Sequence, residues 1–149
     1  MPARHWSRLR RLLPVLLLVV APLPGLAQSQ PSQVERGEYL ARAGDCISCH
    51  TAQGGQPFAG GLRLDTPFGY MLSPNITPDP DTGIGKWSVD EIADYLGSGN
   101  KPDGDVAGGL MAEVIEGTLS GYKDLTQADR VAIAQYLKSI PPIRNKIGK

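Results

Sequence analysis

Cysteine and histidine are scarce in this chain, which has two of each among its 149 residues. The two cysteines, Cys46 and Cys49, lie three positions apart, so a framework of several disulfides is excluded. A zinc site of ordinary composition needs four ligands, and these cysteines with the adjacent His50 supply only three. Aromatic residues make up only 6% of the chain. The sequence therefore has few groups of the kind that bind metals or form cross-links, and they are concentrated in one place.

The first 27 residues carry basic side chains and no acidic one. An apolar run from Leu12 to Ala21 follows, interrupted by Pro14, and Gly25-Leu26-Ala27 then provides the small residues of a cleavage site. This order is typical of a secretory signal peptide, so we expect residues 1–27 to be removed and the protein to be exported. The run is too short and too interrupted by proline for a membrane span. An uncleaved N-terminal anchor is the alternative.

Residues 28–149 are expected to form a single domain without a membrane span. The signal segment contains four of the 15 basic residues and none of the 15 acidic ones, which leaves 11 against 15, a formal charge of −4. That balance argues against a nucleic-acid partner. These 122 residues also contain 17 glycines and 9 prolines, because one glycine and four prolines belong to the signal segment. A chain so rich in loops buries a modest core unless a large apolar cofactor completes it.

The motif Cys46-Ile47-Ser48-Cys49-His50 is the pattern of covalent haem c attachment. Two thiols three positions apart can reach the two vinyl groups of a porphyrin, and the following imidazole can bind the iron as proximal ligand. The motif occurs once, so one haem is expected. A thioredoxin-like C-x-x-C is the other interpretation, but it needs a βαβ context that this sequence lacks.

The second axial ligand of the iron cannot be another histidine, because His5 lies in the signal segment and His50 is the only histidine of residues 28–149. Methionine is the remaining candidate, and Met71 and Met111 follow His50 by 21 and 61 residues. Met111 is favoured because the chain must pass around the porphyrin before it reaches the opposite face. Met71 lies in an apolar stretch and is expected to form part of the pocket wall. The alternative is that Met111 is an ordinary core residue and the iron is five-coordinate.

The periodicity of the sequence predicts an all-α fold of about four short helices. One helix covers residues 33–44 after Ser32, another begins at Ser88 with a capping box to Glu91, and a third follows Thr126 and stops before two prolines. Residues 111–116 form a short helical turn, and residues 51–86 show no regular structure. Seven apolar residues of that stretch are expected to pack on the haem: Phe58, Leu62, Leu64, Phe68, Tyr70, Leu72 and Ile76.

With these features the chain resembles the class I cytochromes c. The segments Thr66-Pro67-Phe68-Gly69, Ser73 to Asp79 and Thr82-Gly83-Ile84-Gly85 with Trp87 are similar to those of the cytochrome subunits of bacterial periplasmic dehydrogenases. The resemblance implies the cytochrome c fold and a periplasmic electron carrier rather than an enzyme. Its partners would be a periplasmic or membrane-bound dehydrogenase and a downstream oxidase.

The resemblance also implies roles for residues around the haem. The first and last helices would cross at Gly37, against Leu40 and Tyr136 or Leu137. The ring N–H of His50 would bond a loop carbonyl, at Pro57 or Pro74. Trp87 or Asn75 would donate to a haem propionate, unless Trp87 is only the hydrophobic staple of the helix that follows it. The rival functional class is a haem enzyme or gas sensor with an open distal site, which the lack of a distal histidine disfavours.

Overall fold

The computed structural model describes residues 31–148, so the predicted signal segment lies outside the described residues. The helices are α1 (Gln33–Ala43), α2 (Cys46–Cys49), α3 (Val89–Ser98), α4 (Gly109–Glu116) and α5 (Gln127–Ser139), with a 3-10 turn η1 (Tyr122–Asp124) before the last. Five α-helices within the described range exceed the expected four, because the haem motif itself forms the single turn α2. In residues 31–148 no helix has the length and apolar character needed to cross a membrane.

The predicted helix starts are confirmed by their caps. Ser32 and Ser88 each accept a hydrogen bond from the N–H of the glutamate three residues later, and that glutamate bonds back to the serine N–H. Thr126 caps α5 without a reciprocal bond, since its hydroxyl accepts from the N–H of Asp129 (3.1 Å). Such caps are local, because all their partners lie within one turn of the chain. They fix where the helices of the core begin.

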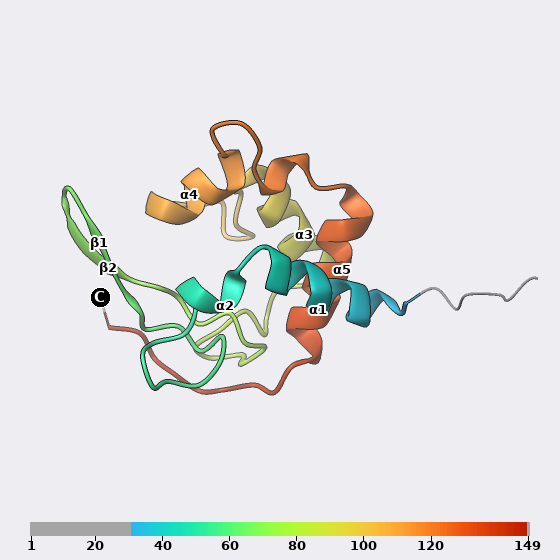
Figure 1. Cartoon of the computed structure of the whole chain (residues 1–149). Helices are drawn as coiled ribbons and strands as arrows, with labels where there is room; N and C mark the ends of the chain where they lie inside the picture. Colours follow the sequence, from blue (N-terminus) through green and yellow to red (C-terminus); the bar gives the residue numbers. More distant parts are fainter. Residues whose placement is uncertain (1–30, 149) are drawn as a thin grey trace, which may run out of the picture.

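Helices α1 and α5 cross and form one side of the core (Figure 1). A Cβ on Gly37 would overlap the carbonyl oxygen of Ala132 and lie 2.9 Å from Cβ of Tyr136, so only glycine allows this close approach. Arg36 and Asp129 form an ion pair across the same contact (2.5 Å). The expected crossing at Gly37 is therefore confirmed. The buried core consists of Phe58, Ile92, Leu96, Ile133, Ala134 and Leu137.

The region without expected regular structure contains an antiparallel hairpin, β1 (Arg63–Thr66) and β2 (Gly69–Leu72). The hairpin projects from the body of the molecule (Figure 1). Phe68 at its turn is fully exposed and Tyr70 is 59% exposed, so neither side chain packs in the core. Four-residue strands give too short an alternation to be read from the sequence, and Pro67-Phe68 is not a typical two-residue hairpin turn. Phe58, by contrast, is buried in the core.

After α5 the chain continues as an extended C-terminal strap, residues 141–148, which runs back along the opposite side of the molecule towards the hairpin (Figure 1). Two prolines, Pro141 and Pro142, end the helix because proline cannot continue its hydrogen-bonding pattern. The side-chain hydrogen bonds and the ion pair of the strap reach residues 59–82. Asn145 donates from its side chain to the carbonyl of Ala59 (2.9 Å), and Arg144 pairs with Asp81 (3.6 Å).

Candidate haem site

The C-x-x-C-H segment follows α1 through a sharp change of direction. Asp45 adopts the left-handed conformation (φ 56°, ψ 32°), which aspartate tolerates better than most residues. Its carboxylate accepts a hydrogen bond from the hydroxyl of Ser48 (2.5 Å). Helix α2 then forms one turn, closed by the bond from His50 N to Cys46 O (3.0 Å). This turn brings Cys46, Cys49 and His50 to the wall of the same space.

That space is a mainly apolar cavity of about 310 Å³. Cys46, Cys49, His50 and Met111 all line it, so residues separated by up to 65 positions meet there. Met71 is not among its lining residues, so the expectation that it forms part of the pocket wall is wrong. The seven apolar residues expected to pack on the haem divide in the same comparison: Ile76 lines the cavity, and Phe58, Leu62, Leu64, Phe68, Tyr70 and Leu72 do not. The apolar part of the wall comes from the loop before α3 and from α3, α4 and α5: Ile84, Trp87, Leu96, Val114, Ile133 and Leu137.

His50 is oriented by the loop opposite the motif. Its Nδ1–H donates to the carbonyl oxygen of Pro74 at 2.9 Å, which confirms Pro74 rather than Pro57 as the acceptor. The bond fixes the tautomer with the proton on Nδ1 and leaves the lone pair on Nε2. Burial lowers the pKa of His50, although the bond to Pro74 acts in the opposite direction. The imidazole is therefore neutral at pH 7, as a metal ligand must be.

The two thiols have different surroundings. Cys46 is half-buried and Cys49 is exposed. Burial raises the pKa of Cys46, which keeps the thiol protonated at neutral pH in the folded chain. Its sulfur lies 3.7 Å from the hydroxyl of Tyr122, which donates to the carbonyl oxygen of Gly44. Tyr122 thereby connects the end of α1 and the first cysteine to the turn before α5.

The two methionines differ in whether they line the cavity. Met111 lies in the first turn of α4, where it packs against the buried core and lines the cavity. The expected helical turn thus begins at Gly109, two residues earlier than predicted. Met71 lies on β2, and its terminal methyl group and sulfur lie beside Gly109, the first residue of α4.

Residues 34–141, most of the chain, match the cytochrome c family. This chain belongs to the cytochrome c family. It is 39% identical to a nicotinate dehydrogenase subunit of Pseudomonas putida over 85% of this chain and 10% of that protein. It is 50% identical to the gluconate 2-dehydrogenase cytochrome c subunit of Pantoea cypripedii over 61% of this chain and 22% of that protein. A diheme cytochrome c-type protein of Cereibacter sphaeroides is 43% identical over 73% of this chain and 36% of its own length.

The cytochrome therefore spans between about a tenth and a third of these longer relatives. Membership of the family makes it an electron-transfer haem protein, with haem c bound covalently, rather than an enzyme. The donor set of the cavity fits that group. Two thiols, a neutral imidazole with a free Nε2 and a thioether meet in a mainly apolar space, which suits a porphyrin and its iron.

Of the two expected propionate donors, Asn75 is excluded and Trp87 stays a prediction. Asn75 cannot donate to a propionate, because its two amide hydrogens already bond Thr82 Oγ1 (3.0 Å) and the carbonyl of Ile143 (2.7 Å). Trp87 lines the cavity, and its ring packs edge-on against Tyr95 with 5.4 Å between centroids. Lys101, which sequence analysis did not single out, also lines the cavity and is the one lysine among the described residues of the wall. Its place in a glycine-rich loop gave no signal of this position.

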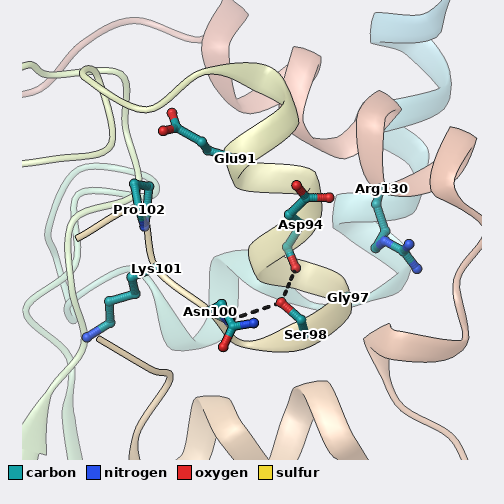
Figure 2. Close-up of a pocket in the computed structure, with 8 residues that line it drawn as sticks. All are labelled: Glu91, Asp94, Gly97, Ser98, Asn100, Lys101, Pro102 and Arg130. Atoms are coloured by element: carbon teal, nitrogen blue, oxygen red, sulfur yellow. Dashed lines mark hydrogen bonds between the residues drawn. The ribbon is translucent and has the colours of Figure 1, made fainter. Parts of the chain in front are cut away.

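A second hollow, of about 480 Å³, lies beside α3 and is lined mostly by polar and charged residues (Figure 2). Glu91 and Asp94 of α3 and Arg130 of α5 line it, together with Lys101, but none of the predicted haem residues does. Ser98 closes the end of α3 there, because its hydroxyl donates to Asp94 O (2.9 Å) and accepts from Asn100 N (3.2 Å). Two carboxylates and two cations line this hollow, which lacks the thiol and imidazole donors of the haem site.

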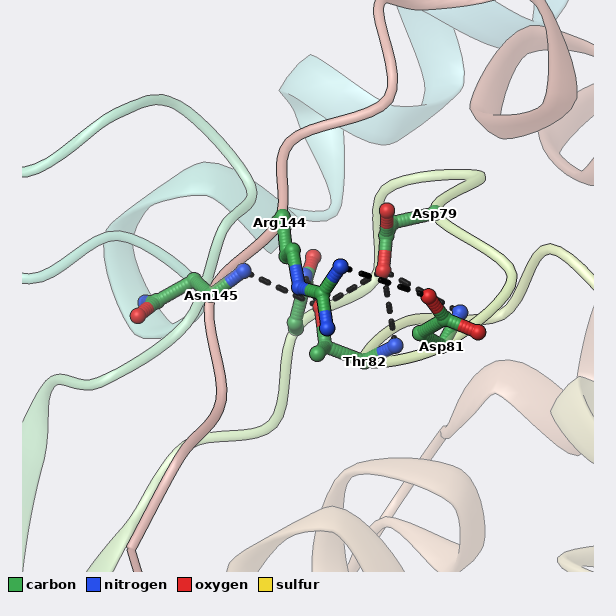
Figure 3. A network of polar contacts seen from close by, with 6 residues as sticks. Asp79, Asp81, Thr82, Arg144 and Asn145 are labelled. Atoms are coloured by element: carbon green, nitrogen blue, oxygen red, sulfur yellow. Dashed lines mark hydrogen bonds and ion pairs between the residues drawn. The ribbon is translucent and has the colours of Figure 1, made fainter.

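The carboxylate of Asp79 bonds to the backbone and side chain of its own turn. Asp79 Oδ1 accepts from the N–H of Thr82 (2.7 Å), the hydroxyl of Thr82 (2.7 Å) and the N–H of Asp81 (3.2 Å) (Figure 3). The hydrogen bonds to Thr82 hold the pKa of Asp79 below its usual range. Among residues 31–148 there is no cluster of three or more histidine, cysteine or acidic side chains that could bind a metal ion.

Proposed function

We propose that this cytochrome holds one haem c through thioether bonds to Cys46 and Cys49, with His50 and Met111 as the axial ligands of the iron. What supports the assignment is that all four side chains line one cavity, although Met111 lies 61 residues beyond His50. When bound, the haem supplies an iron that accepts and releases one electron. The chain holds and orients it, excludes water with an apolar wall, and sets its potential.

The ligand pair distinguishes a carrier from a haem enzyme. A histidine with a methionine fills both axial positions, raises the reduction potential and leaves no site for oxygen or peroxide. Met111 is supported over Met71 because it lines the cavity, whereas Met71 lies on the projecting hairpin. The rival class, a haem enzyme or gas sensor with an open distal site, requires that neither sulfur binds the iron.

Attachment is tested by producing the protein in a host that matures cytochromes c. The wild type should carry one haem per chain that survives denaturation, whereas Cys46→Ala and Cys49→Ala should each lose a thioether bond and most of the holoprotein. The ratio of haem to protein and the intact mass measure both. A doubly linked haem in either variant would contradict the assignment.

Ligation is tested by comparing Met111→Ala with the matched control Met71→Ala. Met111→Ala should lose the weak red absorption band of ferric methionine-ligated haem, lower the potential and allow ferrous CO binding, and Met71→Ala should do none of these. Loss of the band only in Met71→Ala would make Met71 the ligand. A wild type without the band that binds CO readily would favour the open-site class.

The electron donor is proposed to be a periplasmic or membrane-bound dehydrogenase, and the acceptor a downstream oxidase. The relatives named as dehydrogenase subunits support the donor, and a mature charge of −4 favours partners with a basic face. Addition of a candidate dehydrogenase and its substrate should reduce the ferric cytochrome, more slowly as salt rises. No reduction by any dehydrogenase encoded beside it would contradict this part of the proposal.

Export to the periplasm is proposed from residues 1–27. Cleavage after Ala27 should leave Gln28 as the first residue of the secreted protein. The N-terminal sequence and mass of the protein from a periplasmic extract measure this. Recovery of the uncleaved chain in the membrane fraction would instead support the N-terminal anchor.

A further inference from the structure

The C-terminal strap and the proximal histidine are connected by a short series of buried polar contacts. Pro74, whose carbonyl holds His50, is followed directly by Asn75, which is 3% exposed. The side chain of Asn75 uses both hydrogens and its oxygen within the protein. One hydrogen reaches the carbonyl of Ile143 in the strap at 2.7 Å, across 68 positions of sequence. The residue beside the acceptor of His50 is thus bound directly to the strap.

A second contact of the strap reaches the same residue through a threonine. The backbone N–H of Asn145 donates to Thr82 Oγ1 (3.0 Å), which also accepts from Asn75 Nδ2 (3.0 Å) and donates to Asp79 Oδ1 (2.7 Å). Figure 3 shows Asn145, Thr82 and Asp79 meeting in this network. Thr82 therefore has its hydroxyl fully bonded, and every partner belongs either to the strap or to the loop that carries Pro74.

A third contact between the strap and this loop is made at Thr77, which is completely buried. Its N–H and hydroxyl both bond Asn75 Oδ1 (2.9 and 2.7 Å), and its oxygen accepts from the N–H of Ile143 (3.1 Å). Buried polar groups of this kind are costly to leave unpaired, so displacement of the strap would break several bonds together. The peptide that presents Pro74 O to His50 has little freedom while the strap is in place.

We propose that the strap is a positioning element for the proximal ligand: Ile143 and Asn145, through Asn75 and Thr82, hold the Pro74 carbonyl against His50 Nδ1 and thereby set the reduction potential of the iron. This inference rests on the proposed function, because it takes His50 as the ligand. A carbonyl that accepts the outer N–H of a ligating imidazole increases its basicity. A more basic imidazole stabilises ferric iron, so weakening the strap contacts should raise the potential.

The test uses the full-length holoprotein and two substitutions that remove strap contacts without touching His50 or Pro74. Thr82→Val removes the hydroxyl shared by Asn75, Asn145 and Asp79 with little change of volume. Because Thr82 also lines the cavity, a change of potential in this variant supports the inference only together with faster exchange of the His50 hydrogen. Asn145→Pro removes the N–H that bonds Thr82 and the side-chain amide that bonds the carbonyl of Ala59. The matched control is Arg144→Ala, which lies on the same strap but only pairs with exposed Asp81. Each variant is measured by redox titration and by the exchange of the His50 Nδ1 hydrogen with deuterium in NMR spectra.

Thr82→Val and Asn145→Pro should each raise the potential and speed the exchange of the His50 hydrogen severalfold, whereas Arg144→Ala should change neither. A purely structural strap would lower the unfolding midpoint in both variants and leave potential and exchange at wild-type values, which would overturn the inference. If Asn145→Pro fails to accumulate, Thr82→Val with Arg144→Ala still decides the question. Failure of the wild type to bind haem would refute the proposed function instead, so the two failures are distinguishable.

Discussion

The two sides of the cavity are built in different ways. On the His50 side, the loop of residues 58–82 is held by polar contacts across long sequence separations: 24 positions for His50 to Pro74 and 68 for Asn75 to Ile143. On the Met111 side, the backbone hydrogen bonds of residues 99–108 are local within the described chain, and that from Ala107 N to Gly99 O (2.7 Å) spans only eight positions.

Glycine has a different use on each side. Gly60, on the His50 side, packs against the backbone of Pro74 and Asn75 so closely that a side chain has no room. Gly108, before the methionine helix, has open space where a Cβ would project among the described residues. One side of the cavity is thus fixed by backbone contact and polar bonds, and the other by apolar packing of α4 against the core. Breaking each side should therefore have unequal effects.

The largest effect is expected from Gly60→Ala. Gly60 has φ 72°, and its new Cβ would lie 2.5 Å from the carbonyl carbon of Pro74. Strain and steric overlap should together lower the free energy of unfolding by about 3 kcal/mol. The matched control Gly108→Ala, on the Met111 side, should change it by less than about 0.5 kcal/mol, because its φ of −117° is ordinary for alanine. Urea unfolding of both holoproteins measures the difference, and equal losses would contradict the comparison.

How much of the structure can be predicted from the sequence depends on how far apart the interacting residues lie along the chain. The caps at Ser32 and Ser88 were predictable because their partners lie three residues away. For the carbonyl that accepts from His50 the sequence leaves two candidates, Pro57 and Pro74, and the folded loop places Pro74 at the imidazole. The expectation that Asn75 donates to a propionate is wrong, because its partner Ile143 lies in the strap and no local pattern indicates that contact.

The candidate site divides in the same way. The motif itself indicates Cys46, Cys49 and His50, whereas the favoured position of Met111 in the cavity required the path of the whole chain. The exposed Phe68 shows the opposite error, since an apolar residue was expected to be covered. Tyr122, which no motif marks, bonds the end of α1 from the turn before α5. Long-range contacts thus account for what sequence patterns leave out.

An intermediate effect is expected at Tyr122, which contacts the haem motif from the turn before α5. Tyr122→Phe removes the hydroxyl that donates to Gly44 O and contacts Cys46. The free energy of unfolding should fall by about 1–2 kcal/mol, because the carbonyl loses its donor in a partly buried place. Tyr39→Phe is the control, since Tyr39 is 69% exposed and its loss of a hydroxyl should have almost no effect. Thermal and urea unfolding measure the difference. Identical curves for the two variants would show that the Tyr122 hydroxyl does not stabilise the contact with the haem motif.

The smallest effect is expected from giving helix α4 the side-chain cap that it lacks. Helix α4 begins after Gly108, which has extended backbone (φ −117°, ψ 164°) and no side chain to cap it, whereas α3 begins with a full capping box. Gly108→Ser should stabilise the holoprotein by about 0.5 kcal/mol, since serine can bond a free N–H of the first turn and restricts the unfolded chain. The gain should appear in the urea midpoint and, if Met111 is the ligand, as slower entry of added imidazole at the ferric iron. A gain in midpoint with unchanged imidazole entry would mean that the start of α4 does not control access to the iron, and that apolar packing alone holds Met111 in place.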